Sequence, residues 1–114
     1  MIARRSLGLL LLAGLLPAHA ADLPAPAQPI VALNAALLAA MRAGAATPFA
    51  TRAATLRPVV ERVFDLPTIL RNSVGAARWS GFAPAVQQEL MEAFTRFTVA
   101  SWTANFDSFN GERF

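Results

Sequence analysis

Paired carboxylates are the residues in this sequence most able to do chemistry. Glu61 and Asp65 are four residues apart, and Glu89 and Glu92 are three apart. Such pairs can serve general acid–base or glycosidic chemistry. Pairs at these spacings are more often solvated helix faces, and Glu92 with Arg96 has the spacing of an ordinary helical ion pair. We therefore expect no catalytic residues and no enzyme activity, and a carboxylate-based hydrolase stands only as a second alternative.

A second group of oxygen-bearing side chains lies near the end of the chain. Residues 107–112 place carboxylate, hydroxyl and amide oxygens around Gly111. A calcium loop needs alternating ligands over a longer stretch, which this segment lacks. The pattern favours a helix end followed by a turn, so we expect no metal site and no cofactor.

The first twenty residues have the three parts of a secretory signal peptide. Arg4 and Arg5 give a positive start, residues 7–16 form an apolar run, and residues 17–20 end in a small-x-small cleavage pattern. A membrane-spanning helix needs roughly 20 apolar residues, so this run is too short to be an anchor. We expect cleavage after Ala20 and a periplasmic location.

Composition excludes several site classes once residues 1–20 are removed. The sequence has no Cys, Tyr or Lys, and its only histidine, His19, lies in the signal peptide. Histidine-dependent triads, Schiff-base lysines and zinc sites with Cys or His ligands are therefore excluded. Eight arginines remain against seven acidic residues, and they are spaced out without a basic stripe, so no nucleic-acid partner is indicated.

Hydrophobic spacing predicts four helices after a Pro-rich linker at residues 21–29. The predicted helices run from residue 30 to about 43, from 48 to 63, from 66 to 74 and from 84 to about 107. Gly44 is expected to end the first of them. Thr47 is expected to cap the second helix, and Pro58 to kink it or divide it into two short helices. Asp65 is expected to cap the third helix, and Gly75 to end it.

The last predicted helix carries a broad apolar face. It follows a connection at residues 79–82 that bears two aromatic residues, and Ala83 offers no side-chain cap. Two adjacent stripes follow the helical period. The first comprises Val86, Leu90, Phe94, Phe97 and Ser101, and the second comprises Met91, Phe94, Thr98, Trp102 and Phe106. After the turn at residues 110–111, residues 112–114 could begin a strand.

Aromatic residues are numerous for so small a chain. They are Phe64, Trp79, Phe82, Phe94, Phe97, Trp102, Phe106 and Phe109. They could pack a core, or part of this surface could line a cavity for an apolar ligand. Composition alone leaves both interpretations open.

An ordered set of segments resembles the MlaC family, also called the toluene-tolerance family. Residues 55–66, read as Thr-Leu-Arg-Pro-Val-Val-Glu-Arg-Val-Phe-Asp-Leu, are similar to its "L-x-P-V-V … F-D-hydrophobic" segment. Gly75 followed by Trp79 matches the next landmark. The segments at residues 84–90, 94–97 and 109–114 then follow in order. The stretches 94–100 and 110–114 are most similar to the hopanoid-associated HpnM branch.

The resemblance covers about residues 30–114 and implies a fold and a function. It implies a periplasmic carrier that holds phospholipid or hopanoid-related lipid in an apolar pocket, without covalent chemistry. Family members continue into a curved sheet, so we expect residues 30–114 to be the helical N-terminal half of an α+β fold, mainly α and truncated. The implied partners are a lipid, an inner-membrane ABC transporter with its MCE-type complex, and an outer-membrane lipoprotein complex.

The resemblance also implies which side chains meet the lipid. The family arrangement sets the third and fourth predicted helices against the sheet, so their apolar faces would contact acyl chains. The candidate lipid-binding residues are Leu70, Val74, Phe94, Phe97 and Trp102. Each buried methylene contributes about 0.8 kcal/mol, so such a site needs apolar walls and no titratable triad. The first alternative is a helical module that binds a protein of the cell envelope through the same face.

Overall fold

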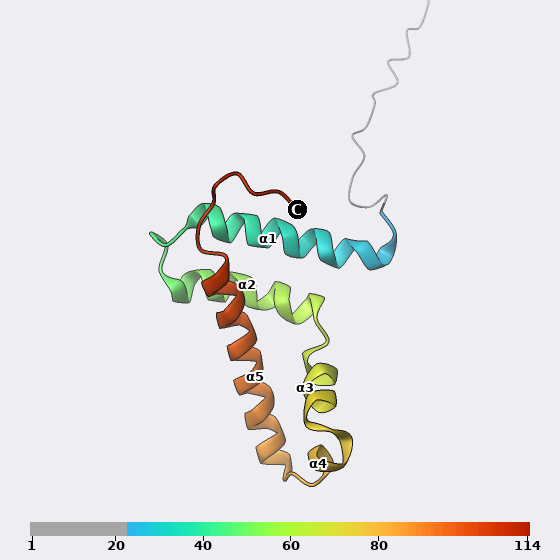
Figure 1. Cartoon of the computed structure of the whole chain (residues 1–114). Helices are drawn as coiled ribbons and strands as arrows, with labels where there is room; N and C mark the ends of the chain where they lie inside the picture. Colours follow the sequence, from blue (N-terminus) through green and yellow to red (C-terminus); the bar gives the residue numbers. More distant parts are fainter. Residues whose placement is uncertain (1–22) are drawn as a thin grey trace, which may run out of the picture.

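The computed structural model describes residues 23–114 (Figure 1). Within this range the chain is helical and contains no strand, which confirms the mainly α class. The elements are a 3-10 turn at Ala25–Ala27 and the helices α1 (Gln28–Ala43), α2 (Phe49–Val63), α3 (Leu66–Val74), α4 (Ala76–Ser80) and α5 (Pro84–Asn105). The predicted signal peptide lies outside the described residues. None of the described helices is long and apolar enough to span a membrane.

Helix α1 begins earlier than the sequence pattern indicated. The predicted linker is wrong from Ala25 onward, because a 3-10 turn leads directly into α1 at Gln28. Pro29 lies in the first turn, where a helix requires no backbone N–H donor. The helix ends as predicted at Gly44, which adopts a positive φ of 67°.

Helix α2 corrects two expectations. Pro48, and not Thr47, occupies the N-cap position, and the Thr47 hydroxyl instead donates to the carbonyl of Ala43 at 3.3 Å. Pro58 does not divide the helix, which continues through it to Val63. Burial of the neighbouring Leu56 and Val60 explains this continuity, since packing of an apolar face can outweigh one lost hydrogen bond.

Helices α3 and α4 form one end of the molecule. Asp65 caps α3 as predicted, because its Oδ1 accepts a hydrogen bond from the backbone N–H of Thr68 at 3.2 Å. Gly75 ends α3 with a φ of 93°. The connection predicted at residues 79–82 is partly wrong, since Trp79 and Ser80 belong to α4. A hydrogen bond ties α4 to α5, because Nε2 of Gln87 on α5 donates to the backbone carbonyl of Trp79 at 2.8 Å.

Helix α5 buries a different face from the one predicted. Its buried residues are Thr95, Val99 and Thr103, whereas Phe97 remains 69% exposed. The two threonine hydroxyls donate to the carbonyls four residues earlier, at 2.9 and 2.8 Å, so neither buried oxygen lacks a partner. The helix ends at Asn105, before the predicted boundary. Residues 107–114 are irregular, so the strand suggested at residues 112–114 is not formed in the described part of the chain.

The helices pack as a pair and an arm. Helices α1 and α2 lie side by side, while α3 and α5 run together away from them to α4 at the far end (Figure 1). One buried cluster joins α1 and α2 through Leu33, Leu37, Ala40 and Leu56. A second joins α2, the start of α3 and α5 through Val60, Leu66 and Val99. Phe64 and Trp102 contact both clusters, so they link the pair to the arm.

Candidate functional site

A groove of about 530 Å³ runs along one side of α5. Its lining comes from the second half of this helix and from Phe106, which directly follows it: Phe97, Thr98, Ser101, Trp102, Asn105 and Phe106. These positions recur at intervals of three and four residues, which places them on adjacent rows of one helix face. The hydroxyls of Thr98 and Ser101 donate to the α5 carbonyls of Phe94 and Phe97, both at 2.8 Å. Their polarity is therefore largely used within the helix, and the groove surface is mainly apolar.

Two of the lining residues, Trp102 and Phe106, belong to a stack of aromatic rings. The Trp102 indole lies between Phe64 and Phe106, with ring centroids 5.6 and 5.4 Å away and interplanar angles of 25° and 24°. Offset stacking at such distances is favourable beyond the area that it buries. Because Phe64 also contacts both core clusters, the stack fixes the groove wall to the core.

The structure brings only some of the predicted lipid-binding residues together. Phe97 and Trp102 both line the α5 groove. Leu70 is buried, with 9% of its surface exposed, and Val74 is half-buried near the end of α3. Phe94 packs against the cluster that contains Val99. Leu70 and Phe94 therefore lie within the helical packing, while Phe97 and Trp102 reach the groove.

Phe106 lines the groove although it was absent from the predicted site. It belongs to the second apolar stripe of the sequence pattern, one helical turn after Trp102. That spacing is the signal that could have identified it, because residues four apart on a helix are neighbours. Thr98 and Ser101 also lie on the two predicted stripes, whereas Asn105 carries no comparable signal because its amide group is typical of a solvated helix face.

Two arginines fix α5 against α2. The guanidinium of Arg52, 7% exposed, donates from Nη1 to the carbonyl of Thr103 and from Nε to the carbonyl of Thr47, both at 3.1 Å. The exposed Arg57 donates to both carboxylate oxygens of Glu92, at 3.2 and 3.1 Å. One contact lies near each end of the α2–α5 crossing, so together they restrict rotation of α5 and of the groove that it carries.

Glu61, Asp65 and Glu92 are engaged in structural contacts. Arg57 pairs with Glu61 at 2.8 Å and also with Glu92, so the ion pair predicted between Glu92 and Arg96 is wrong among the described residues. Hydrogen bonding to Arg57 holds the pKa of Glu92 below its ordinary value. A general acid needs a raised pKa, so this shift runs against acid catalysis. Within residues 23–114 no cluster of His, Cys, Asp or Glu is arranged to hold a metal ion.

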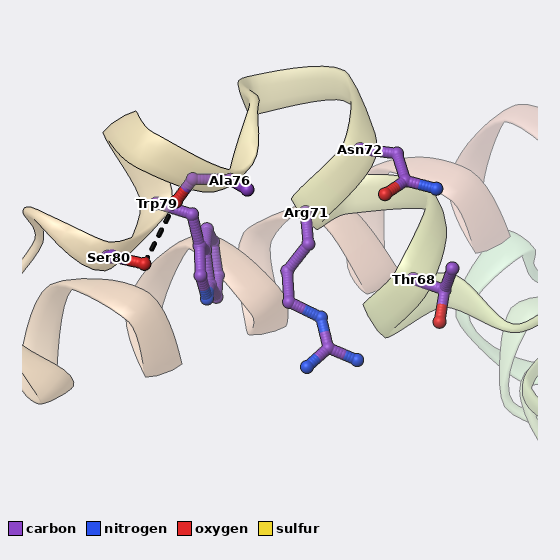
Figure 2. Close-up of a pocket in the computed structure, with 6 residues that line it drawn as sticks. All are labelled: Thr68, Arg71, Asn72, Ala76, Trp79 and Ser80. Atoms are coloured by element: carbon purple, nitrogen blue, oxygen red, sulfur yellow. Dashed lines mark hydrogen bonds between the residues drawn. The ribbon is translucent and has the colours of Figure 1, made fainter.

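A second, more polar hollow lies between α3 and α4 (Figure 2). It has a volume of about 420 Å³ and is lined by Thr68, Arg71, Asn72, Ala76, Trp79 and Ser80. The Arg71 side chain extends on the same side as the Trp79 indole, as Figure 2 shows. This hollow therefore differs from the α5 groove both in chemistry and in position.

Comparison with known proteins identifies a family for most of the chain. The family model described as "MlaC protein" matches residues 32–114, which include all five helices except the first turn of α1. Comparison with curated proteins and with solved structures found no match.

Proposed function

Because the chain belongs to the MlaC family of periplasmic phospholipid-binding transport components, we propose that it is a non-covalent lipid carrier whose α5 groove contacts acyl chains. The observation that carries this proposal is the exposed aromatic groove on α5. Phe97 leaves 69% of its surface in contact with water, beside the ring stack of Trp102 and Phe106. A large apolar surface of this kind is typical of a binding site.

The size and chemistry of the groove support an acyl ligand. Sites for small molecules are mostly apolar hollows of about 300–1,000 Å³, and the α5 groove falls within that range. An acyl chain leaves a bilayer only if each of its methylenes, worth about 0.8 kcal/mol, finds an equally apolar surface. In this proposal Phe97, Trp102 and Phe106 contact the acyl chain of the lipid directly.

The other predicted residues take different positions in this proposal. Leu70 and Phe94 support the groove from within the helical packing, because they lie against the core. Val74 is half-buried on α3 and remains a candidate contact.

We further propose that the helices form part of a longer α+β fold, whose sheet would close the groove. The exposure of Phe97 supports this proposal, since a sheet packed on α5 would cover it.

Lipid extraction tests the site directly. Purified Phe97→Asp protein should keep the circular dichroism spectrum of the wild type and lose at least most of its co-purifying lipid, because a charge in the groove opposes an acyl chain. Val31→Asp is the matched control, since Val31 is an exposed apolar residue on α1. It should retain wild-type lipid. A folded Phe97→Asp variant that carries as much lipid as Val31→Asp would reject the groove, and absence of lipid from wild type would favour the protein-interaction module.

The lipid class and the partners are finer proposals. The similarity of residues 94–100 and 110–114 to the HpnM branch leads us to propose a hopanoid-related lipid as well as phospholipid. Mass spectrometry of the extract separates the two classes, and an extract with phospholipid alone would reject the hopanoid role.

We also propose that the protein exchanges lipid with two complexes. One is an inner-membrane ABC transporter with its MCE-type complex, and the other is an outer-membrane lipoprotein complex. Crosslinking in cells would identify these partners.

A further inference from the structure

The turn at Asn110 and Gly111 joins two residues that can react with each other. Asparagine carries a primary amide at Cγ, and the backbone nitrogen of the following residue can close a five-membered ring onto that carbon. Glycine favours the reaction because it has no Cβ to obstruct the approach and its backbone reaches many conformations. The pair occurs once in the chain, since the other three asparagines precede Ala, Ser and Phe.

The structure leaves this pair accessible. Residues 107–114 are irregular, and both Asn110 and Gly111 are exposed. Gly111 has a φ of 87°, and no atom beyond the neighbouring residues lies within 4 Å of the position that a Cβ would take there. Among residues 23–114 its N–H makes no backbone hydrogen bond, so nothing holds this nitrogen away from the asparagine side chain.

The other asparagines are held in helices. Asn34, Asn72 and Asn105 lie in α1, α3 and α5. In a helix the N–H of the next residue donates to a carbonyl four residues earlier, and the helical dihedrals keep its nitrogen away from the side-chain Cγ. Even at the end of α5, the N–H of Phe106 donates to the carbonyl of Trp102 at 3.1 Å. The fold therefore singles out the asparagine in the turn.

We propose that Asn110 is a site of spontaneous deamidation. The backbone nitrogen of Gly111 loses its proton to solvent and attacks Cγ of Asn110, so that a new C–N bond forms. Nδ2 takes up a proton from solvent and leaves as ammonia. Water then hydrolyses either C–N bond of the resulting succinimide, which gives aspartate or isoaspartate at position 110. The whole reaction consumes one water and releases one ammonia, with no change of oxidation state.

Glu112 makes the turn sensitive to this change. The backbone N–H of Asn110 donates to Oε2 of Glu112 at 2.6 Å and lowers the pKa of that carboxyl, with smaller effects from the Glu112 backbone and the Asn110 side chain. Deamidation replaces the neutral amide with a second carboxylate, and neighbouring like charges disfavour each other. The product should therefore open the turn, and isoaspartate also lengthens the main chain by one methylene.

The turn lies between two contacts that attach the end of the chain to the helices. On one side, Arg42 of α1 lies 4.9 Å from the centroid of the Phe109 ring. On the other, Phe114 contacts Phe106 with ring centroids 6.1 Å apart. Figure 1 shows the segment returning alongside α1. A change in the turn alters the spacing between these contacts, so deamidation should loosen residues 107–114 from α1.

Mass spectrometry of protein aged in mildly alkaline buffer tests the proposal. The tryptic peptide of residues 97–113 contains both Asn105 and Asn110, so each sample carries its own comparison. Position 110 should gain about 1 Da and yield both aspartate and isoaspartate, while Asn105 stays unchanged. Asn110→Gln should stop the reaction, because the longer side chain cannot close a five-membered ring. Gly111→Ala should slow it several-fold, because a Cβ obstructs the attack.

Urea separates the effect of the fold from that of the sequence. Asn110 should react at a similar rate in buffer and in urea, since the folded protein already exposes it. Asn72 should react faster in urea, because unfolding removes the helix that protects it. NMR titration measures the effect on the turn: the pKa of Glu112 in Asn110→Asp should lie above that of wild type.

Several outcomes would overturn the proposal. The site is rejected by equal modification of Asn105 and Asn110 in the folded protein, by an Asn110 that reacts only in urea, or by equal rates in Gly111→Ala and wild type. An unchanged pKa of Glu112 in Asn110→Asp would reject the opening of the turn. None of these measurements depends on bound lipid, so their failure would leave the carrier function untouched.

Discussion

The guanidinium group of Arg52 is a buried charge held by backbone carbonyls. It donates to Thr47 at the start of α2 and to Thr103 near the end of α5. The last carbonyls of a helix have no partner within the helix, and they attract cations because the helix dipole is negative there. Arg52 therefore satisfies an otherwise unpaired carbonyl and ties two helices that are far apart in sequence.

We expect Arg52→Met to lower the free energy of unfolding by about 2–3 kcal/mol, because two carbonyls lose a charged donor. Arg52→Lys should cost less than Arg52→Met, since an ammonium keeps the charge but cannot reproduce the planar fork. Urea unfolding followed by circular dichroism measures both changes. Arg57→Gln is the exposed comparison and should change stability much less. Equal losses for Arg52→Met and Arg57→Gln would show that the buried contact has no special role.

Asp65 should make stability depend on acid pH. The hydroxyl and backbone N–H of Thr68 bind the charged carboxylate, so they lower the pKa of Asp65 from its ordinary value of 3.8. A carboxyl whose pKa is lower in the folded state stabilises the fold above pH 3.8, and this stabilisation is lost as pH falls through the folded pKa. We expect Asp65→Ala to lower the melting temperature at pH 7 and to approach wild type as the pH falls below the lowered folded pKa of Asp65. Asp107→Ala, which removes an exposed carboxylate after α5, controls for the loss of one negative charge.

At the scale of elements, Pro58 is a helix-breaking residue that helix α2 tolerates. The residue is exposed and provides no N–H for the carbonyl of Ala54, which must bind water instead. Pro58→Ala should restore that hydrogen bond without leaving a cavity, and we expect a gain of about 1–3 kcal/mol in the free energy of unfolding. Thermal unfolding measures the gain. A loss of stability would mean that the proline ring makes a packing contribution that exceeds the hydrogen bond.

Local signals in the sequence predicted the helix boundaries that depend on a single residue. Asp65 before a Pro-containing turn and the glycines at 44 and 75 act through their own backbone and neighbours, so their roles are visible without the fold. Pro58 and the short helix α4 were misjudged because tertiary contacts decide them. Leu56 and Val60 hold α2 together by burial, and Gln87 on the following helix α5 donates a hydrogen bond to the Trp79 carbonyl of α4.

The candidate site was predictable only in part for a related reason. Hydrophobicity placed Phe97 and Trp102 on apolar stripes, and both reach the groove. It could not indicate that Thr95 and Thr103 would face the core, because a threonine hydroxyl can be satisfied by the carbonyl one turn back. Thr95, Val99 and Thr103 occupy the buried face of α5, and Phe97 lies on its exposed side. The groove exists because polar-looking residues occupy the buried face.

At the scale of the whole molecule, Trp102 and Phe106 belong both to the groove and to the packing around the core, whereas Phe97 and Ser101 belong to the groove alone. The two buried clusters belong to the contacts of α1, α2, α3 and α5, and they are complete without the groove residues Phe97 and Ser101. Changes at Phe97 should therefore alter binding while the helices remain folded. Leu70→Asp makes the contrast, since an unpaired charge at a site only 9% exposed costs several kcal/mol and should unfold the arm.

The open groove should also determine how the lipid-free protein associates. Contiguous apolar surface exposed to water favours contacts between molecules, and the α5 groove gathers Phe97, Trp102 and Phe106 on one face. We expect lipid-free wild type to show concentration-dependent association in sedimentation velocity. Phe97→Asp should shift it toward monomer, because the introduced carboxylate lies where 69% of the side chain meets solvent and prevents a second molecule from covering the groove. Saturation with lipid should have the same effect on wild type, whereas Val31→Asp should leave association unchanged. A compact, monodisperse wild-type monomer without lipid or detergent would contradict this account, since the groove would then be stable in water uncovered.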